Sequence, residues 1–310
     1  MKATRLGSNM LNKIEMKWKL IIAMLFAGLV PLLCTGIYAI NGAEEALHNK
    51  GFDQLNSLKT VKKVEVENYF RQIESQVLTL SENKMTIDMM RKLKSSFHSL
   101  KSDLNIDKQK VSDYKRELRD FYDDEFGSKY TQETTKSTSA GQLMPDSDIG
   151  VIAQHLYISN NKFPLGNKSK LDNANDGSKY STIHDDYHPA MRRYLEKFGY
   201  YDIFLVDHKT GDIVYSVFKE IDYATNLYSG AHKGSGIAEV VSKAANSRSN
   251  NQTMVNDFAS YLPSYDAAAS FIASPIFEQD KMIGILVFQM PVGEINSRLE
   301  VAQGLGESGE

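Results

Sequence analysis

Leu20–Ile40, which reads LIIAMLFAGLVPLLCTGIYAI, is the stretch around which the rest of the chain is arranged. It has 21 residues and no charged side chain. At a rise of about 1.5 Å per residue, a helix of this length measures roughly 31 Å, which is enough to cross the hydrocarbon core of a bilayer. Gly28 and Pro31 are tolerated in such a helix, because neighbouring groups and local adjustments satisfy the backbone. The sequence therefore predicts a transmembrane helix over residues 20–40.

The residues before this helix predict its orientation. Five basic side chains precede it, against the acidic Glu15: Lys2, Arg5, Lys13, Lys17 and Lys19. Since cytoplasmic flanks are rich in Lys and Arg, we expect residues 1–19 to form a cytoplasmic tail and the chain after residue 40 to lie outside the cytoplasmic (inner) membrane. The alternative is a cleaved signal peptide, whose apolar region is usually about 7–15 residues long. Ala39, Gly42 and Ala43 make only a loose cleavage site.

Composition narrows the classes of function. The net charge is −3 with both signs mixed along the chain, so no nucleic-acid partner is expected. The only cysteine, Cys34, lies in the membrane stretch, which leaves the remainder without a disulfide, a thiolate nucleophile or a cysteine metal site. The sequence also has no Gly-rich phosphate loop, nucleophile elbow or zinc-protease helix. We therefore expect no enzymatic activity and no cofactor.

A long amphipathic helix is predicted to follow the membrane stretch. Residues 41–104 contain no proline. Apolar side chains recur on one helical face, at Leu55, Leu58, Val66, Tyr69, Ile73, Val77 and Leu80. Lys62 interrupts this face. A second helix is predicted over residues 107–126, and Gly127 is predicted to end it. Together they form a helical stalk over residues 41–128, for which we expect a homodimer; packing of the helix within one monomer explains the pattern equally well.

The next part of the chain is predicted to contain loops and short helices. Polar segments at 129–148 and 160–182 are predicted loops, with a short helix between them at 149–158. Pro189 is predicted to open another short helix, which Gly199 closes. Loops of this length tend to be functional or disordered in a compact domain.

Signals for strands come next. Apolar, β-branched and aromatic runs separated by turn residues predict two hairpins. These are Tyr200–Val206 with Ile213–Phe218, and Ala269–Phe277 with Met282–Met290. Between them the sequence predicts a helix at Gly236–Ala245 and a strand at Met254–Phe258. This order predicts an α+β fold for residues 129–292, in which one antiparallel sheet is flanked by helices.

Three of these stretches resemble a known family. GYYDIFLVDHKTGDIVYSVFKE at 199–220 and ASPIFEQDKMIGILVFQMPVGEIN within 269–296 are similar to the extracytoplasmic Cache sensor, a PAS-like fold, of bacterial methyl-accepting chemotaxis receptors. MKWKLIIAMLFAGLVPLL at 16–33 resembles the first membrane span of such receptors. The resemblance implies a periplasmic or extracellular sensor domain that binds a small ligand and transmits the signal across the membrane. Similar sensors also belong to histidine kinases and nucleotide cyclases, which are the alternative outputs.

The end of the chain departs from a whole receptor. GLGESGE at 304–310 resembles the opening of a second Cache-like module, without a second span, HAMP linker or methylated signalling hairpin after it. We interpret residues 293–310 as a linker and the start of a truncated second module. Some sensors of this fold bind amino acids through an Arg–aromatic motif after the first hairpin. Here YSGAHKGSG at 228–236 has no Arg or Trp, so amino-acid binding is not supported.

Two pairs of residues have a spacing or setting that could suit a metal or catalytic site. His184 and His188 are four residues apart, a spacing that can place two imidazoles on one helical face for a metal. Pro189 follows directly and disfavours helix at His188, so we expect no metal there. Asp257 and Asp266 bracket an aromatic loop, but a glycosidase would also need an open sugar cleft.

The candidate ligand site combines polar and aromatic residues around the predicted sheet. It consists of Arg192, Tyr215, Lys219, Asp257, Tyr261 and Tyr265. Tyr215 and Lys219 lie two steps of strand alternation apart and are predicted to share a face. A lysine beside tyrosines suits an anionic group of a small-molecule ligand, because partial desolvation strengthens the attraction. A cleaved periplasmic binding protein and a hydrolase are the rival classes of function, and membrane fractionation tests the first.

Overall fold

The structure is a computed structural model that describes residues 15–290 and 292–299. The chain divides into two compact units. The first unit is formed by residues 1–64 together with 303–310, and the second unit is formed by residues 65–302. Most of the predicted cytoplasmic tail and the end of the predicted linker, residues 300–310, lie outside the described residues.

The described part of the first unit is helical from Met16 onward. Helix α2 (Met16–Ser81) contains the whole uncharged stretch, with Pro31 inside it. Its apolar side chains between residues 16 and 64 are almost all exposed. Within the described residues, α2 is the one helix long and apolar enough to cross a membrane.

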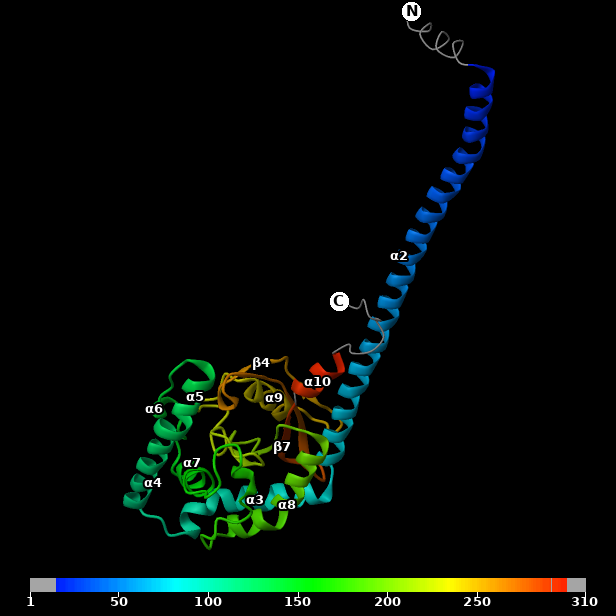
Figure 1. Ribbon diagram of the computed structural model, residues 1–310. Helices are drawn as coiled ribbons and strands as arrows, with labels where there is room; N and C mark the ends of the chain where they lie inside the picture. The colour runs from blue at the N-terminus through cyan, green and yellow to red at the C-terminus, as the bar shows by residue number, and fades with distance from the viewer. Residues whose placement is uncertain (1–14, 291, 300–310) are drawn as a thin grey trace, which may run out of the picture. The chain divides into compact units, whose positions relative to one another are not determined.

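The second unit is built on a five-stranded antiparallel sheet with the strand order β2-β1-β7-β6-β3 (Figure 1). The strands are β1 (Asp202–Val206), β2 (Ile213–Ser216), β3 (Met254–Val255), β6 (Phe271–Glu278) and β7 (Lys281–Gln289), and a separate pair is formed by β4 (Ala259–Tyr261) and β5 (Ala267–Ala269). Both predicted hairpins are confirmed, and Gly211 takes the positive φ of +83° that the first turn requires. The predicted strand at 254–258 is confirmed for its first two residues.

Each face of the sheet is covered by helices. Helices α3 (Lys84–Asp103) and α8 (Lys179–Phe198) pack on one face, and α9 (Gly236–Ala245) packs on the other. On β1, Ile203 and Leu205 point into the first core, whereas Phe204 and Val206 point into the second. Because both faces are buried, the strands read in the sequence as nearly continuous apolar runs. The predicted α+β class is therefore confirmed.

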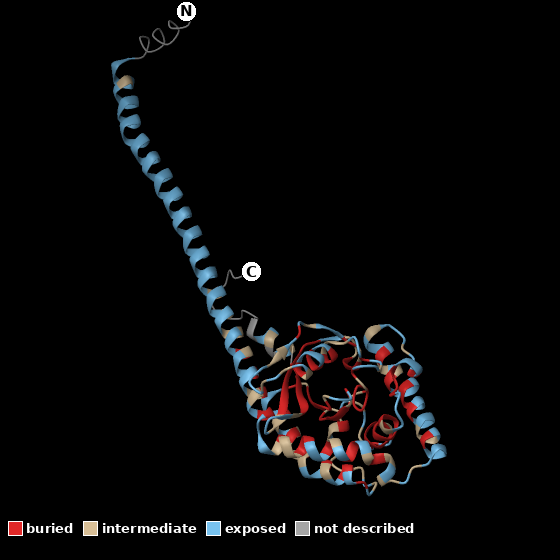
Figure 2. Ribbon diagram, turned by 180° about the vertical axis from the view of Figure 1, so that it is seen from behind, coloured by how far each residue is buried: buried red, intermediate tan, exposed pale blue. Residues whose placement is uncertain are grey.

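A second group of helices packs beyond α3. It contains α4 (Lys108–Asp120), α5 (Gly127–Thr134), α6 (Ala140–Leu143) and α7 (Asp148–Gln154), with the π-helical segments η1 (Phe121–Phe126) and η2 (His155–Ser159). Helix α7 packs against α3 and α4, and the buried residues gather on the inward sides of these helices (Figure 2). The remaining elements are the 3-10 helices η3 (Lys168–Lys170) and η4 (Leu262–Ser264) and the helix α10 (Val292–Leu299), which occupies the start of the predicted linker.

The predicted stalk differs from the structure in two ways. The long helix is broken after Ser81, and the Asn83 side chain caps the new helix α3 by accepting a hydrogen bond from the backbone N–H of Met85 at 2.8 Å. From residue 65 onward, the helices belong to the same compact unit as the sheet. Four residues of the predicted apolar face are buried there: Tyr69, Ile73, Val77 and Leu80. This part of the face is thus covered within one monomer, as the alternative interpretation predicted, whereas Leu55 is exposed.

Gly127 does not end a helix as predicted. It accompanies a π-helical turn, in which its N–H is donated to the carbonyl of Tyr122, and α5 continues to Thr134. A Cβ at residue 127 would lie 2.9 Å from that carbonyl oxygen, so the glycine permits a close backbone approach. The predicted loop at 129–148 is consequently helical in part, and Leu143 is buried.

Pro189 does not open its helix either. Helix α8 begins ten residues earlier, where the Ser178 hydroxyl accepts a hydrogen bond from the N–H of Ser181 at 3.0 Å. The carbonyl that the missing Pro189 N–H leaves free belongs to Asp185, an exposed residue, so water can serve it. Gly199 closes the helix as predicted, with φ of +72°.

The tight packing of α7 gives a test of the fold. Gly150→Ala would place a Cβ 2.6 Å from the carbonyl oxygen of Ala224 and 2.7 Å from the Pro145 ring. Since neither a backbone atom nor a proline ring can turn aside, we expect the free energy of unfolding to fall by about 1–3 kcal/mol in urea titrations of the detergent-solubilised chain. The control is Gly234→Ala, whose Cβ would meet no atom within 4 Å and which should change stability by less than about 0.5 kcal/mol. Equal stability of the two variants would contradict the packing described.

Candidate functional site

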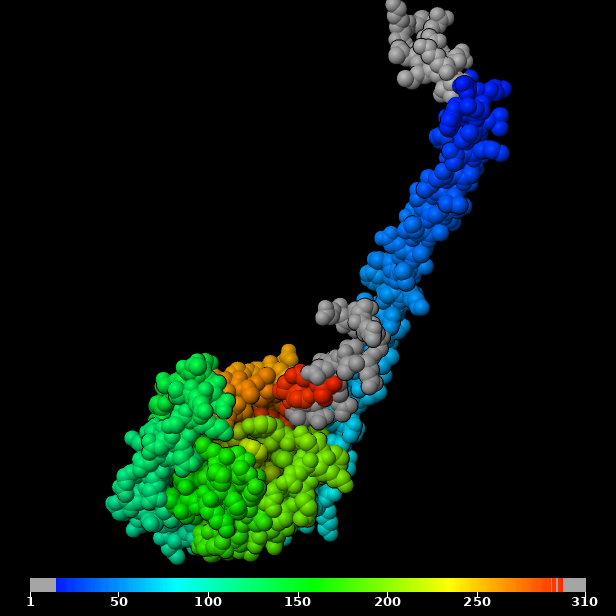
Figure 3. Space-filling view, viewed as in Figure 1, coloured from blue at the N-terminus to red at the C-terminus, as the bar shows by residue number. Residues whose placement is uncertain are grey.

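A cavity of about 340 Å³ lies in the second unit, within the usual size range of small-molecule pockets. Its walls come from η1 and α5, from the loop at 165–168, from the segment 218–221 after β2, and from residues 263–267. The green and orange surfaces that contain these segments meet on one face of the unit (Figure 3). Elements from distant parts of the sequence therefore enclose one space.

The segment after β2 is held in place by a buried carboxylate. Asp202 Oδ1 accepts hydrogen bonds from the backbone N–H groups of Val217 and Phe218, both at 2.9 Å. Its Oδ2 accepts one from the Ser216 hydroxyl at 2.9 Å. Burial raises the pKa of Asp202 to about 6, although these donors and Lys219 oppose the rise. The start of β1 is thus fastened to the segment that forms one wall of the cavity.

Aromatic rings make up much of the cavity wall. Phe126 of η1 stacks on Tyr265 with 5.4 Å between ring centroids. Tyr201 and Phe218 pack together at 5.2 Å, and Phe121 contributes a further ring. Such a wall suits the apolar part of a small ligand.

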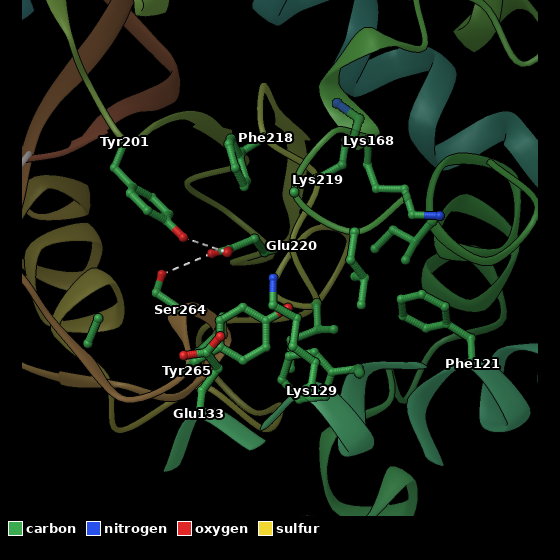
Figure 4. A pocket seen from close by; sticks show the side chains of 17 residues that line it. Phe121, Lys129, Glu133, Lys168, Tyr201, Phe218, Lys219, Glu220, Ser264 and Tyr265 are labelled. Carbon is green, nitrogen blue, oxygen red and sulfur yellow. Dashed lines mark hydrogen bonds between the residues drawn. The ribbon is translucent and has the colours of Figure 1, made fainter. Parts of the chain in front are cut away.

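Two lysines bring positive charge to the cavity. Lys129 of α5 has its Nζ 4.7 Å from the centroid of the Tyr265 ring and reaches toward Glu220 (Figure 4). Lys168 is buried; its Nζ donates to the carbonyl of Asn161 at 3.0 Å, and burial lowers its pKa. Lys129 is therefore the cation best placed to meet a ligand.

Glu220 is the acidic group of the inner wall. One of its carboxyl oxygens accepts a hydrogen bond from the Tyr201 hydroxyl at 2.8 Å, and the other accepts one from Ser264 at 2.9 Å (Figure 4). Burial and the carboxylate of Asp222 raise its pKa well above the ordinary value, and Asp202 adds to this, while the two hydrogen bonds lower it. The pKa of Asp222 is also raised, to about 7, by burial and by Asp202.

Lys219 departs from its predicted role. It does lie with Tyr215, and it borders the cavity, but its side chain is only 2% exposed. Its Nζ lies over three tyrosine rings, 5.5 Å from the centroid of Tyr157, 4.5 Å from Tyr215 and 4.8 Å from Tyr223. It also donates to the carbonyl of Ser216. Burial lowers the pKa of Lys219 to about 7, and the charge of Asp202 opposes this shift. Because its contacts are with core groups, Lys219 has a structural role.

Tyr215 and Arg192, also predicted site residues, do not line the cavity. Tyr215 is fully buried, and its hydroxyl shares a hydrogen bond of 2.7 Å with His188 Nδ1. Arg192 donates to the carbonyl of Ser169 and to the carboxylate of Asp172, each at 2.6 Å. These contacts attach the polar loop before α8 to that helix, which is a structural role.

The aromatic loop before the second hairpin contributes one predicted residue to the cavity. Tyr265 lines it, whereas Tyr261 is buried and donates to Asp222 at 2.6 Å. Asp257 is exposed and accepts a hydrogen bond from the backbone N–H of the following residue at 2.8 Å. Asp266 joins this loop to α5, since its Oδ2 accepts from Lys136 at 2.7 Å and from Tyr130 at 2.9 Å.

His184 and His188 both lie inside α8, contrary to the expectation that Pro189 disfavours helix there. Their rings stack at 4.3 Å, and His184 Nδ1 lies 2.6 Å from the carbonyl of Asp172. Burial and the charge of Lys219 lower both histidine pKa values well below the ordinary value. In the part of the chain that the structure describes, no group of three or more His, Cys, Asp and Glu residues is arranged to hold a metal.

Sequence reasoning missed the residues that dominate the cavity. Lys129 fell in a predicted exposed loop, and Lys168 fell in another. Glu220 follows the predicted strand Ile213–Phe218 and carries no sequence signal of its own. Phe121 and Phe126 belonged to a predicted helix, but a regular α-helical period does not anticipate a π-helical turn.

Comparison with known proteins gives little further guidance. No protein-family model and no curated protein matches the chain. The chain is similar to the crystal structure of the sensor domain of the V. cholerae histidine kinase DctB, with 12% sequence identity and a TM-score of 0.29. The match covers 62% of this chain and 60% of that one, which is less than two thirds of its length. A likeness at this level carries no argument about function.

The burial of Lys219 gives a prediction about stability. Lys219→Ala removes the core contacts with three tyrosines and leaves a void, so we expect the free energy of unfolding to fall by roughly 2–5 kcal/mol in urea titrations at pH 7. The matched control is Lys129→Ala, since that lysine lies on the cavity wall; its cation–π contact should be worth less than about 1 kcal/mol. An unchanged free energy of unfolding in Lys219→Ala would contradict the core role of this lysine.

Proposed function

We propose that the chain is the ligand-sensing part of a membrane-anchored signalling protein, and that the cavity binds a small organic molecule with a negatively charged group. The observation that carries the proposal is the cavity itself: aromatic rings surround it, and the ammonium group of Lys129 reaches into it from α5. The aromatic wall suits an apolar body and the ammonium suits an anion.

The cavity is proposed to bind its ligand without a chemical step. The chain after residue 40 lacks cysteine and the recognised catalytic motifs, and the cavity wall offers rings, lysines and acids that suit binding. We therefore propose a binding module rather than an enzyme, without a cofactor.

The output of this sensor is proposed from the sequence resemblance. The sequence resemblance favours a methyl-accepting chemotaxis receptor, a transducer in which ligand binding biases one of two arrangements of the sensor. A histidine kinase or a nucleotide cyclase is the alternative. The solved structure described above belongs to a kinase, but its TM-score gives this no weight. The genomic sequence after residue 310 would distinguish these outputs.

Pairing of two copies through α2 is part of the same proposal. Several large apolar side chains on this helix beyond the membrane stretch are exposed: Leu47, Phe52, Leu55, Val61 and Val64. A second copy of the same helix offers matching apolar side chains, which makes a homodimer the proposed partner.

Ligand binding can be tested with the full chain in detergent. We expect a thermal-shift screen against small carboxylic acids, amines and sugars to find ligands among the acids, since Lys129 is the accessible cation. Lys129→Ala should then weaken binding by roughly 1.5–3 kcal/mol, the range for a hydrogen bond to a charged group, as measured by calorimetry. Lys243→Ala is the control, because this exposed lysine of α9 lies outside the cavity wall and should leave the affinity unchanged. A ligand that binds the wild type and Lys129→Ala with equal affinity would show that the binding site lies elsewhere.

Membrane topology gives a separate prediction. Because the uncharged stretch follows a basic flank, residues 1–19 are expected to stay in the cytoplasm. In permeabilised cells, a protease that reaches only the periplasm should therefore digest the chain beyond about residue 41 and spare a tag at Met1. A soluble product cleaved near Ala43 would instead identify the stretch as a signal peptide.

A further inference from the structure

The carboxyl group of Glu220 is unusual in the wall of a pocket that is proposed to bind an anion. It lines the cavity and is only partly exposed. Its recorded partners, the hydroxyls of Tyr201 and Ser264, bring no positive charge to it. An ionised Glu220 would therefore repel an anionic ligand at short range, and this repulsion would be strong because the site is desolvated.

The surroundings of Glu220 disfavour its ionised form further. Asp222, two residues on, is fully buried; its Oδ2 accepts from Tyr261, while Oδ1 has no partner within the described structure. Asp202 is a third buried carboxyl, at the start of β1. Three acids close together in one buried region cannot all ionise without a large cost, so they retain protons at a higher pH than an exposed acid does.

Other titratable groups also face this part of the cavity, from every element around it. They are Tyr201 before β1, Lys219 on the segment after β2, Lys129 and Glu133 on α5, Lys168 of η3, and Tyr265 after η4. The ammonium of Lys219 is directed into the tyrosine core, and that of Lys168 is bonded to a backbone carbonyl. Lys129 remains as the cation that faces Glu220. An anionic group of a ligand could therefore contact Lys129 and Glu220 at the same time.

We propose that Glu220 is the specificity-determining residue of the cavity, and that it enters the complex as a neutral carboxylic acid that donates a hydrogen bond to a carboxylate of the ligand. This inference rests on the proposed function and deepens it. The ligand is then a carboxylate with an apolar body, and it binds together with one proton that Glu220 holds. Lys129 supplies the positive charge and Glu220 supplies a short, charge-assisted hydrogen bond.

An ammonium-bearing ligand is the competing assignment for the same residue. It would pair with an ionised Glu220 and with the aromatic rings. Lys129 and Lys168 oppose this, because both would lie in the same cavity as the cation. The two assignments predict opposite effects of pH on binding, which makes them separable.

The first measurement needs no ligand. If folding favours the neutral form of Glu220, its contribution to stability is fully present below the pKa of an unfolded glutamate, about 4.5, and is lost as the pH rises through the higher folded value. Glu220→Gln has a neutral group of similar shape that cannot ionise, so its stability does not fall with pH for this reason. The melting temperature of Glu220→Gln relative to wild type should therefore rise between pH 5 and pH 8.5. A difference that stays constant over this range overturns the proposal, whether or not a ligand is found.

The second measurement uses benzoate, hexanoate and glutarate as carboxylate probes on the full chain in detergent. Calorimetry in two buffers of different ionisation enthalpy should show proton uptake on binding above the pKa of Glu220. There the apparent dissociation constant should rise about tenfold per pH unit. In Glu220→Gln both effects should disappear. An acid that binds without proton uptake, a ligand that proves to be an amine, or failure of all three probes each overturns this inference.

Two variants serve as controls. Glu133→Gln makes the same substitution at an exposed glutamate of the same wall and should keep the pH dependence of the wild type. Asp222→Asn removes the neighbouring charge and should move the pH midpoint downward, toward that of an exposed acid.

The broader function, a ligand sensor, fails only if no compound in the acid, amine and sugar screen binds more weakly to Lys129→Ala than to the wild type. A bound amine that does respond would support a ligand sensor but would contradict both the anionic ligand and the neutral form of Glu220.

Discussion

The carboxylate of Asp202 fixes the part of the molecule on which the cavity depends. Its two oxygens collect the backbone N–H groups of Val217 and Phe218 and the hydroxyl of Ser216, all of which follow or end β2. Satisfying a buried carboxylate requires several such donors, since an unpaired one would be costly. Because those donors come from one short segment, the turn that carries Glu220 has little freedom to adopt another shape.

The sheet decides where a ligand can be held. Both of its faces are covered by buried apolar side chains, with α3 and α8 on one side and α9 on the other. Space remains beyond the strand ends, where Tyr201 precedes β1 and Phe218 follows β2. Loops and the helices η1 and α5 close that space, and their side chains rather than the sheet determine its chemistry.

The sequence predicted the fold well because the evidence for it is local. Apolar runs around Gly211 gave the first hairpin, and the residues of α9 were predicted to their last position. The site was predicted poorly because it depends on contacts between distant segments. Period-2 alternation placed Lys219 beside Tyr215, but the strand ends at Ser216 and Lys219 has φ of +63°, which turns its side chain into the core. No spacing indicates that α5 faces this turn.

The cavity is lined by side chains from two layers of the unit. Lys129 belongs to the helical group through α5, and Glu220 belongs to the segment fastened to β1. Their recorded partners are an aromatic ring for Lys129 and two hydroxyls for Glu220, so both retain capacity for a charged group of the ligand. A ligand shifts a conformational equilibrium only through a difference in its affinity for the two states. A group held between these two side chains would supply such a difference whenever the layers move relative to each other, so selectivity and signalling would depend on the same pair.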